Sequence, residues 1–113
     1  MPKQVTDIDV LKKYFQGVMD KANHHAQNVN EVILPIVGGV IWRKDDEALE
    51  VMEREGEMKN VLWFKVGGTR YAFSFNHDTN EIELRQGTTQ GNVIASFSNT
   101  MTNNNVKQVF ERL

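Results

Sequence analysis

Residues 60–99 read NVLWFKVGGTRYAFSFNHDTNEIELRQGTTQGNVIASFSN. In this stretch, four short runs of apolar and β-favouring residues alternate with turn signals at Gly67-Gly68, at residues 76–80 and at residues 87–91. Short strands joined by turns rich in glycine and asparagine are typical of an antiparallel meander. We therefore expect a meander sheet here, with the rest of the chain packed on it.

The alternation of side chains along these strands predicts a core face rich in aromatic side chains and an opposite face that, because it carries tryptophan, should also need to be covered. The side chains expected to face the core are Leu62, Phe64, Val66, Tyr71, Phe73, Phe75, Val93, Ala95 and Phe97. Trp63 and Ile94 alternate with these positions and should lie on the opposite face.

Both ends of the chain show the periodicity of amphipathic helices. In residues 6–29, apolar residues recur at spacings of three and four, which predicts a long N-terminal helix. Near the other end, Thr102 can cap a short helix with a stripe of apolar side chains. That stripe consists of Val106, Val109, Phe110 and Leu113.

The two segments in the middle of the chain, residues 32–44 and 45–58, are each compatible with more than one secondary structure. Residues 32–44 are rich in β-branched residues, and Gly38-Gly39 can form a hairpin turn between two strands or a kink in one bent strand. Pro35 cannot donate a ladder hydrogen bond, so it indicates a sheet edge or a bulge. Residues 45–58 are acidic and rich in good helix formers, which favours a helix capped by Asp45 or Asp46 over a charged strand from 48 to 54.

These elements predict a single α+β domain over residues 1–113. It should contain an antiparallel meander sheet of about five to six strands, packed by a long N-terminal helix and a short C-terminal helix. The 113 residues are 40% hydrophobic and 25% charged, as in a globular protein. No apolar run is long enough to span a bilayer, and residues 1–10 lack the apolar segment of a secretory signal. A cytoplasmic location is therefore expected.

Charge and cysteine content exclude several classes of function. A formal net charge of −2 argues against a binder of duplex nucleic acid, which usually carries a basic face. The absence of cysteine excludes disulfides, thiol catalysis and cysteine-ligated zinc. No motif for phosphate, dinucleotide or metal binding occurs, so we expect no cofactor.

Four polar residues are weak candidates for chemistry. His25 is expected near the apolar stripe of the first helix, and His77 lies among turn-forming residues. Glu81 and Glu83 share one face of their strand at roughly 6–7 Å, a spacing that paired carboxylates could use. Arg85 follows on the same face, which favours a surface ladder of alternating charge. The sequence therefore leans away from an enzyme without deciding the question.

Tryptophans give the strongest indication of a binding surface. Trp42, Trp63 and Ile94 are expected on the face or edges of the sheet that the aromatic core leaves free, and Pro35 marks an edge. Tryptophan is enriched among interface hot spots. With helices enough for about one face, the other face is predicted to form a homodimer or a higher homo-oligomer.

From VLWFKVGGTRYAFSF (61–75) to EIELRQG (81–87), the chain resembles the small orphan α+β proteins encoded on bacterial integron gene cassettes. The resemblance implies a bacterial, cytoplasmic and often oligomeric protein. It carries no functional residues over, because such proteins share a source rather than a motif.

Three functions follow, in order of preference. The first is a non-enzymatic binding or interaction protein that forms a homo-oligomer through the tryptophan-bearing sheet face. The second is a small enzyme or ligand-binding domain for a small molecule or protein, with His25, His77 and a glutamate around a cleft. The third, less favoured, is a nucleic-acid-associated regulator or toxin–antitoxin component that uses Lys12, Lys13 and Lys21.

Overall fold

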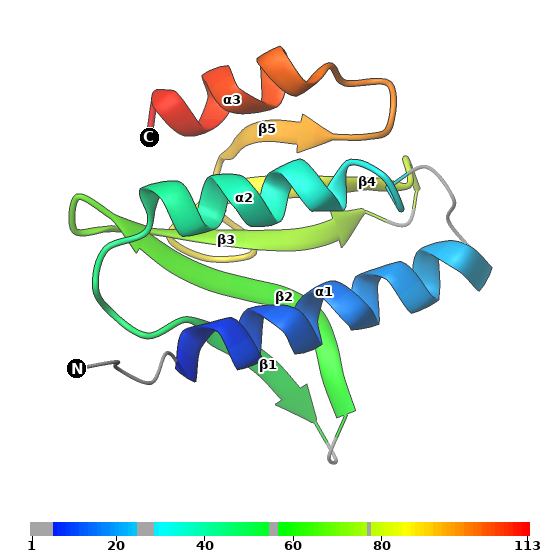
Figure 1. Ribbon diagram of the computed structural model, residues 1–113, viewed down its shortest axis with the longest axis horizontal. Coiled ribbons are helices and arrows are strands. Elements are labelled where there is room, and N and C mark those ends of the chain that lie inside the picture. Colours follow the sequence, from blue (N-terminus) through cyan, green and yellow to red (C-terminus); the bar gives the residue numbers. More distant parts are fainter. Residues whose placement is uncertain (1–5, 25–28, 55–56, 77) are drawn as a thin grey trace, which may run out of the picture.

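The computed structural model describes residues 6–24, 29–54, 57–76 and 78–113, with side chains except at positions 6, 7, 10, 20–24, 52–54 and 57–60. Within these ranges, three helices lie on one side of a five-stranded antiparallel sheet (Figure 1). The strands are β1 (Glu50–Arg54), β2 (Glu57–Val66), β3 (Thr69–Asn76), β4 (Glu81–Gln86) and β5 (Val93–Phe97). They are hydrogen-bonded in chain order. The predicted α+β class and meander are confirmed.

The β2–β3 connection shows why the meander could be predicted. Gly67 and Gly68 both have positive φ, +58° and +83°. A two-residue turn with positive φ at both positions matches the right-handed twist of the strands that it joins, and glycine adopts it without steric cost.

The core lies between the sheet and the helices, and phenylalanine rings form its centre. Phe64 stacks on Phe73 with ring centroids 5.3 Å apart, and Phe73 meets Phe97 edge-on at 6.0 Å. Phe110 closes the cluster from the helical side, at 6.1 to 6.5 Å from these three rings. All four side chains are at most 2% exposed.

The three helices cover this face of the sheet side by side. The helix α1 (Thr6–His24) packs over β1 and β2, α2 (Ile33–Arg43) lies in the middle, and α3 (Asn103–Glu111) lies beside α2 (Figure 1). As predicted, Thr102 caps α3, because its Oγ1 accepts a hydrogen bond from the N–H of Asn105 at 3.1 Å. The helix docks through the predicted residues Val106 and Phe110.

The prediction of strands over residues 32–44 is wrong, since this segment forms α2. Ile33, Ile36 and Val40 recur at helical spacing and are all buried. Pro35 lies in the first turn of α2, where its missing N–H breaks no helical hydrogen bond. Gly39 does not form a turn but packs against Phe110. The contact is so close that a Cβ at this position would collide with the Phe110 ring.

The N–H groups at the beginning of α2 find their hydrogen-bond acceptor in a residue far away in the sequence. Val32, at the N-cap position, offers no capping side chain. Instead, Asn99 accepts hydrogen bonds through Oδ1 from the N–H groups of Glu31 (3.0 Å) and Val32 (2.9 Å), and donates through Nδ2 to Asn30. These bonds take up N–H groups that a helix start leaves unpaired.

The prediction of a helix over residues 45–58 is also wrong, and the charged strand that it was weighed against is present as β1. Val51 pairs with Leu62 of β2, and the preceding Leu49 is buried. Pairing with β2 therefore overrides the helix propensity of the glutamates, as tertiary contacts often do.

Asp45 caps a turn rather than a helix. Its two carboxylate oxygens accept hydrogen bonds from the N–H groups of Gly67 and Gly68, both at 2.8 Å. Its own N–H donates to the carbonyl oxygen of Lys65 at 2.7 Å. These bonds hold the segment after α2 against the β2–β3 turn. The hydrogen bond from Gly68, followed by that from Gly67, lowers the pKa of the Asp45 carboxyl.

This contact predicts how stability depends on pH. A carboxyl whose pKa is lowered by folding stabilises the protein above its unfolded pKa of about 3.9, and the contribution is lost as pH falls through the folded value. Asp45→Asn should lower the melting temperature at pH 7 on the order of 5 °C, because an amide oxygen cannot replace both charged acceptors. The difference from the wild type should shrink as the pH is lowered below about 4.

Circular dichroism melts of both proteins between pH 7 and pH 3 test this, with Asp46→Asn as the control, since Asp46 is an exposed neighbour. A difference between wild type and Asp45→Asn that stays constant across this range would contradict the assignment.

In β5, the expected alternation is only partly correct. Phe97 is buried as predicted, but Val93 is 46% exposed rather than inward. The register between β4 and β5 shifts at Leu84/Arg85, so that Val93 lies opposite Arg85. Such a bulge moves the following side chains to the other face of the sheet, and an isolated sequence does not reveal it.

Candidate functional site

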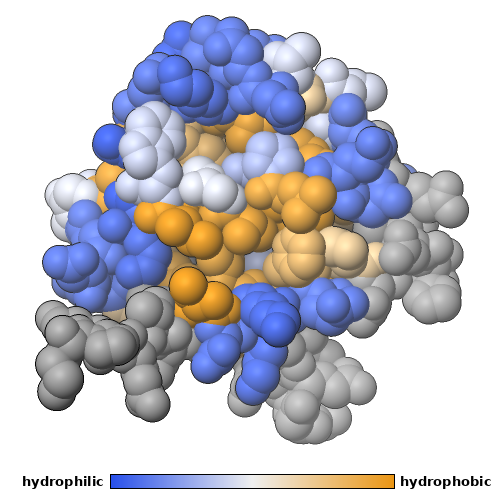
Figure 2. Space-filling view, in the orientation of Figure 1, coloured by the Kyte–Doolittle hydropathy of each residue, from blue (hydrophilic) through white to orange (hydrophobic). Residues whose placement is uncertain are grey.

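The outward surface of α2 is apolar over its whole length. We call the side of this helix formed by Leu34, Pro35, Gly38, Ile41 and Trp42 the α2 outer face. Leu34 is 61% exposed, Ile41 54% and Trp42 52%. Figure 2 shows apolar side chains gathered in the centre of this side of the molecule, over α2.

The sequence of α2 explains this surface. From Ile33 to Trp42 the helix contains no charged or polar side chain, and Arg43 is its first charge. A helix that is apolar on all sides is normally buried on all sides. Here α1 and α3 flank the helix and leave its outer face open.

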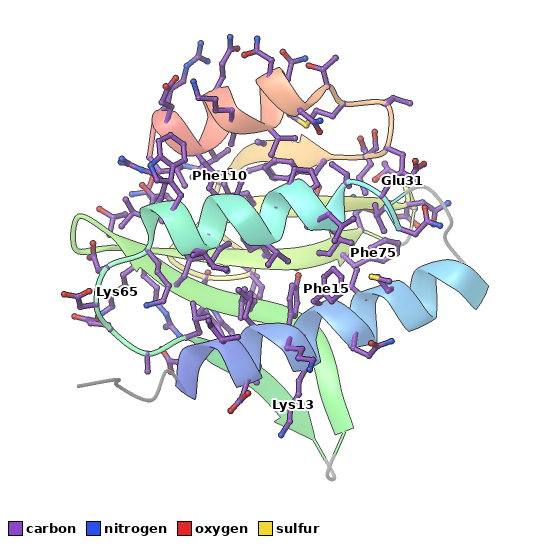
Figure 3. All side chains as sticks on the ribbon, viewed as in Figure 1. Lys13, Phe15, Glu31, Lys65, Phe75 and Phe110 are labelled. Carbon is purple, nitrogen blue, oxygen red and sulfur yellow. The ribbon has the colours of Figure 1, made fainter. Side chains whose placement is uncertain are left out.

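A shallow groove runs along one flank of this face. It has a volume of about 160 Å³ and lies between α2 and α3. Its lining residues are Pro35, Gly38, Gly39, Trp42, Asn103, Val106, Lys107 and Phe110. Figure 3 shows Phe110 lying between the two helices. Pockets for small-molecule ligands usually measure about 300–1,000 Å³, so this groove fits a single side chain better than a metabolite.

The two ends of the α2 outer face differ in charge. Glu31, exposed, stands just before the helix (Figure 3). At the other end, the guanidinium carbon of Arg43 lies 5.5 Å from the centroid of the Trp42 ring. The Nε of Arg43 is buried and has no hydrogen-bond partner among the described residues.

The opposite face of the sheet is charged rather than apolar. Trp63 lies there, half-buried, with the guanidinium carbon of Arg70 at 5.0 Å from its ring centroid. Arg70 in turn lies 3.5 Å from Glu50, and Lys65 pairs with Glu47 at 2.8 Å. The contact with Glu47 raises the pKa of Lys65.

The two candidate glutamates of β4 lie on this charged face. Glu83 accepts hydrogen bonds from Arg85 at 2.9 Å and from Asn76 at 3.2 Å. The bond from Arg85, followed by that from Asn76, lowers the pKa of Glu83. Glu81 lies opposite Asn76 in the register. A carboxylate held in its ionised form by an arginine is poorly suited to act as a general acid near neutral pH.

The predicted interaction residues do not form one surface. Trp42 and Pro35 share the α2 outer face, so their expected position on the sheet is corrected. Trp63 lies on the charged face of the sheet, and Ile94, 41% exposed, lies in the edge strand β5. Leu34 and Ile41 were missed by sequence reasoning, although the uninterrupted apolar run of α2 was the signal that could have found them.

The remaining polar candidates either lie outside the described residues or are exposed on the surface of α1. His25 and His77 lie outside the described residues, as does the side chain of Lys21, while Lys12 and Lys13 are exposed on α1. In the part of the chain that the structure describes, His, Asp and Glu side chains do not gather in threes around a possible metal position. Over the same ranges, each helix is too short or too polar to cross a membrane.

Comparison with known proteins agrees with the resemblance in the meander. Residues 11–107 match the family described as integron cassette protein VCH_CASS1 chain. A search of curated proteins gives no match. Because the family match spans most of the chain, the protein belongs to this integron cassette protein family.

Proposed function

We propose that the protein is a non-enzymatic interaction protein that works as a homo-oligomer, and that the α2 outer face is its contact surface. One observation carries the proposal: Leu34, Ile41 and Trp42, all more than half exposed, lie on the outer side of a single helix within about two turns. Isolated exposed apolar residues are common, but a contiguous patch usually marks an interaction site.

The energetics favour covering this face. Burying a large apolar side chain fully gains about 1.5–3 kcal/mol, so completing the burial of half-exposed ones gains roughly half of that each. Trp42 also adds the residue type most enriched in interface hot spots. A net charge of only −2 gives little electrostatic repulsion between copies.

The charged sheet face, which the sequence suggested for this role, is the weaker candidate. Its tryptophan, Trp63, is already stacked by Arg70 of the same chain, and the charges around it are paired with one another. Covering this face would require desolvating those ion pairs, which opposes association.

Membership of an integron cassette family supports a bacterial protein. A cytoplasmic location, expected from the sequence, completes the proposal.

Ile41→Glu tests the contact surface. The position is exposed, so the glutamate should be tolerated in the single subunit, whereas an interface would have to bury its charge. Sedimentation and light scattering at up to about 500 μM should show the wild type above 13.0 kDa. We expect Ile41→Glu to weaken association by about 100-fold, because an unpaired charge is costly to bury.

Trp63→Ala, on the charged sheet face, is the matched control and should associate like the wild type. A wild-type protein that stays at 13.0 kDa throughout would overturn self-association. Loss of association in Trp63→Ala with no effect of Ile41→Glu would move the interface to the sheet.

A further inference from the structure

We infer that two copies pair through their α2 helices, antiparallel, with a two-fold axis passing beside Gly38. This geometry rests on the proposed function and makes it specific. The apolar residues of the α2 outer face stand at positions −4, −3, +3 and +4 from Gly38, which are Leu34, Pro35, Ile41 and Trp42. A two-fold interface must be self-complementary, and a pattern symmetric about its centre meets that condition.

The rotation of the helix decides which of these residues meet. At 100° per residue, Gly38 faces directly away from the core, and Leu34 and Ile41 fall on one side of it. Pro35 and Trp42 fall on the other side, along the groove with α3. In an antiparallel pair, Leu34 therefore packs on Ile41 of the second copy, and Trp42 packs over Pro35 of the second copy.

Charge complementarity selects the antiparallel over the parallel arrangement. Glu31 stands seven residues before Gly38 and Arg43 five residues after it, at about 10 Å and 8 Å along the helix. An antiparallel pair brings Glu31 of each copy near Arg43 of the other, whose guanidinium carbon lies beside the exposed Trp42, 5.5 Å from its ring centroid. A parallel pair would place like charges together at both ends, which is unfavourable.

Gly38 allows the two helices to come close. A Cβ at this position would have no atom of its own chain within 4 Å, so the backbone is open to the outside. Helix axes pack about 8–10 Å apart, and with Cα atoms at a radius of about 2.3 Å the two facing Gly38 Cα atoms would lie about 3–5 Å apart.

The size of the patch predicts a weak dimer. A few half-exposed apolar side chains offer about 400 Å² per copy, or roughly 800 Å² in total before flanking contacts are added. Stable interfaces bury about 1,200–2,000 Å², and smaller ones are usually transient. We therefore expect a dissociation constant of about 10–100 μM.

Single cysteines in this cysteine-free chain test the geometry directly. Under mild oxidation, Gly38→Cys should form a cross-linked dimer, because the upper part of the separation expected between the facing Cα atoms reaches the range of about 4.4–6.8 Å that a disulfide needs. Leu34→Cys alone should not, because symmetry places its two copies about 12 Å apart along the helix. Leu34→Cys mixed with Ile41→Cys should cross-link, and Gln108→Cys on exposed α3 controls for random collision.

A charge exchange gives a second, independent readout. Glu31→Arg and Arg43→Glu should each weaken association about 5- to 10-fold at low salt, and the double variant should recover most of the loss.

The outcomes separate the two proposals. A chain that stays monomeric and gives no cross-link overturns both of them. A chain that associates but cross-links Leu34→Cys with itself, or fails to cross-link Gly38→Cys, overturns the antiparallel geometry and leaves self-association standing. Cross-linking of Gly38→Cys and of the Leu34→Cys and Ile41→Cys mixture, without Leu34→Cys alone, supports the inference.

Discussion

Phe110→Ala should destabilise the fold by about 3–5 kcal/mol, as expected for removal of a buried phenylalanine. The ring is fully buried and lies against Phe64, Phe73 and Phe97, so that the sheet and α3 share it. It also supports Gly39 of α2. The cavity left behind would loosen two helices at once. Since a domain of this size is stable by only about 5–15 kcal/mol, much of the native stability would be lost.

Urea titration followed by circular dichroism measures this loss at low protein concentration. Gln108→Ala, an exposed position on the same helix, is the control and should change stability by less than about 0.5 kcal/mol. A loss below about 1 kcal/mol in Phe110→Ala would mean that α3 is an accessory to the core and not part of it.

The neighbouring glycines of α2 should respond to alanine with opposite signs. At Gly38 there is open space around a Cβ, so Gly38→Ala should stabilise the monomer by up to about 1 kcal/mol through helix propensity. At Gly39 a Cβ would collide with the Phe110 ring. This ring cannot easily move away, because it is packed against three other buried aromatic rings. Overpacking of this kind costs about 1–3 kcal/mol and should outweigh the gain in propensity.

Each glycine variant serves as the control for the other, since the chemical change and the helix are the same. Denaturation at concentrations well below those at which copies associate isolates the effect on the single subunit. If both variants are stabilised, Gly39 is not a packing contact. If both are destabilised, the surface above Gly38 is not open.

The elements whose structure is determined by residues close together in the sequence could be predicted. Alternating apolar residues and glycine turns identified β2 to β5, while Thr102 and the stripe ending at Phe110 identified α3. The segment of α2 was misread because Pro35, Gly38 and Gly39 are strand-edge and turn signals in most contexts. Two tertiary contacts make a helix possible here. Phe110 packs on Gly39, and Asn99 accepts hydrogen bonds from the N–H groups at the beginning of the helix. Neither contact is visible in a local stretch of sequence.

The candidate site was predicted in part and for a mistaken reason. Trp42 and Pro35 do stand on an exposed surface, yet that surface belongs to a helix and not to the sheet. Trp63 was expected on an apolar face, but cross-strand neighbours such as Arg70 make that face charged. Which charges surround a strand residue depends on its partner strands, and the sequence of one strand does not contain that information.

The hydrogen bonds of Asn99 imply an order of events during folding. Each strand of the meander pairs with its neighbour in the chain, so the sheet can grow through short loops. The beginning of α2, in contrast, needs an amide 67 and 68 positions away. Such a contact closes a long loop, so we expect it to form after the strands have paired. The helix that carries the apolar surface is thus expected to be fixed in place last, once the sheet is there to receive it.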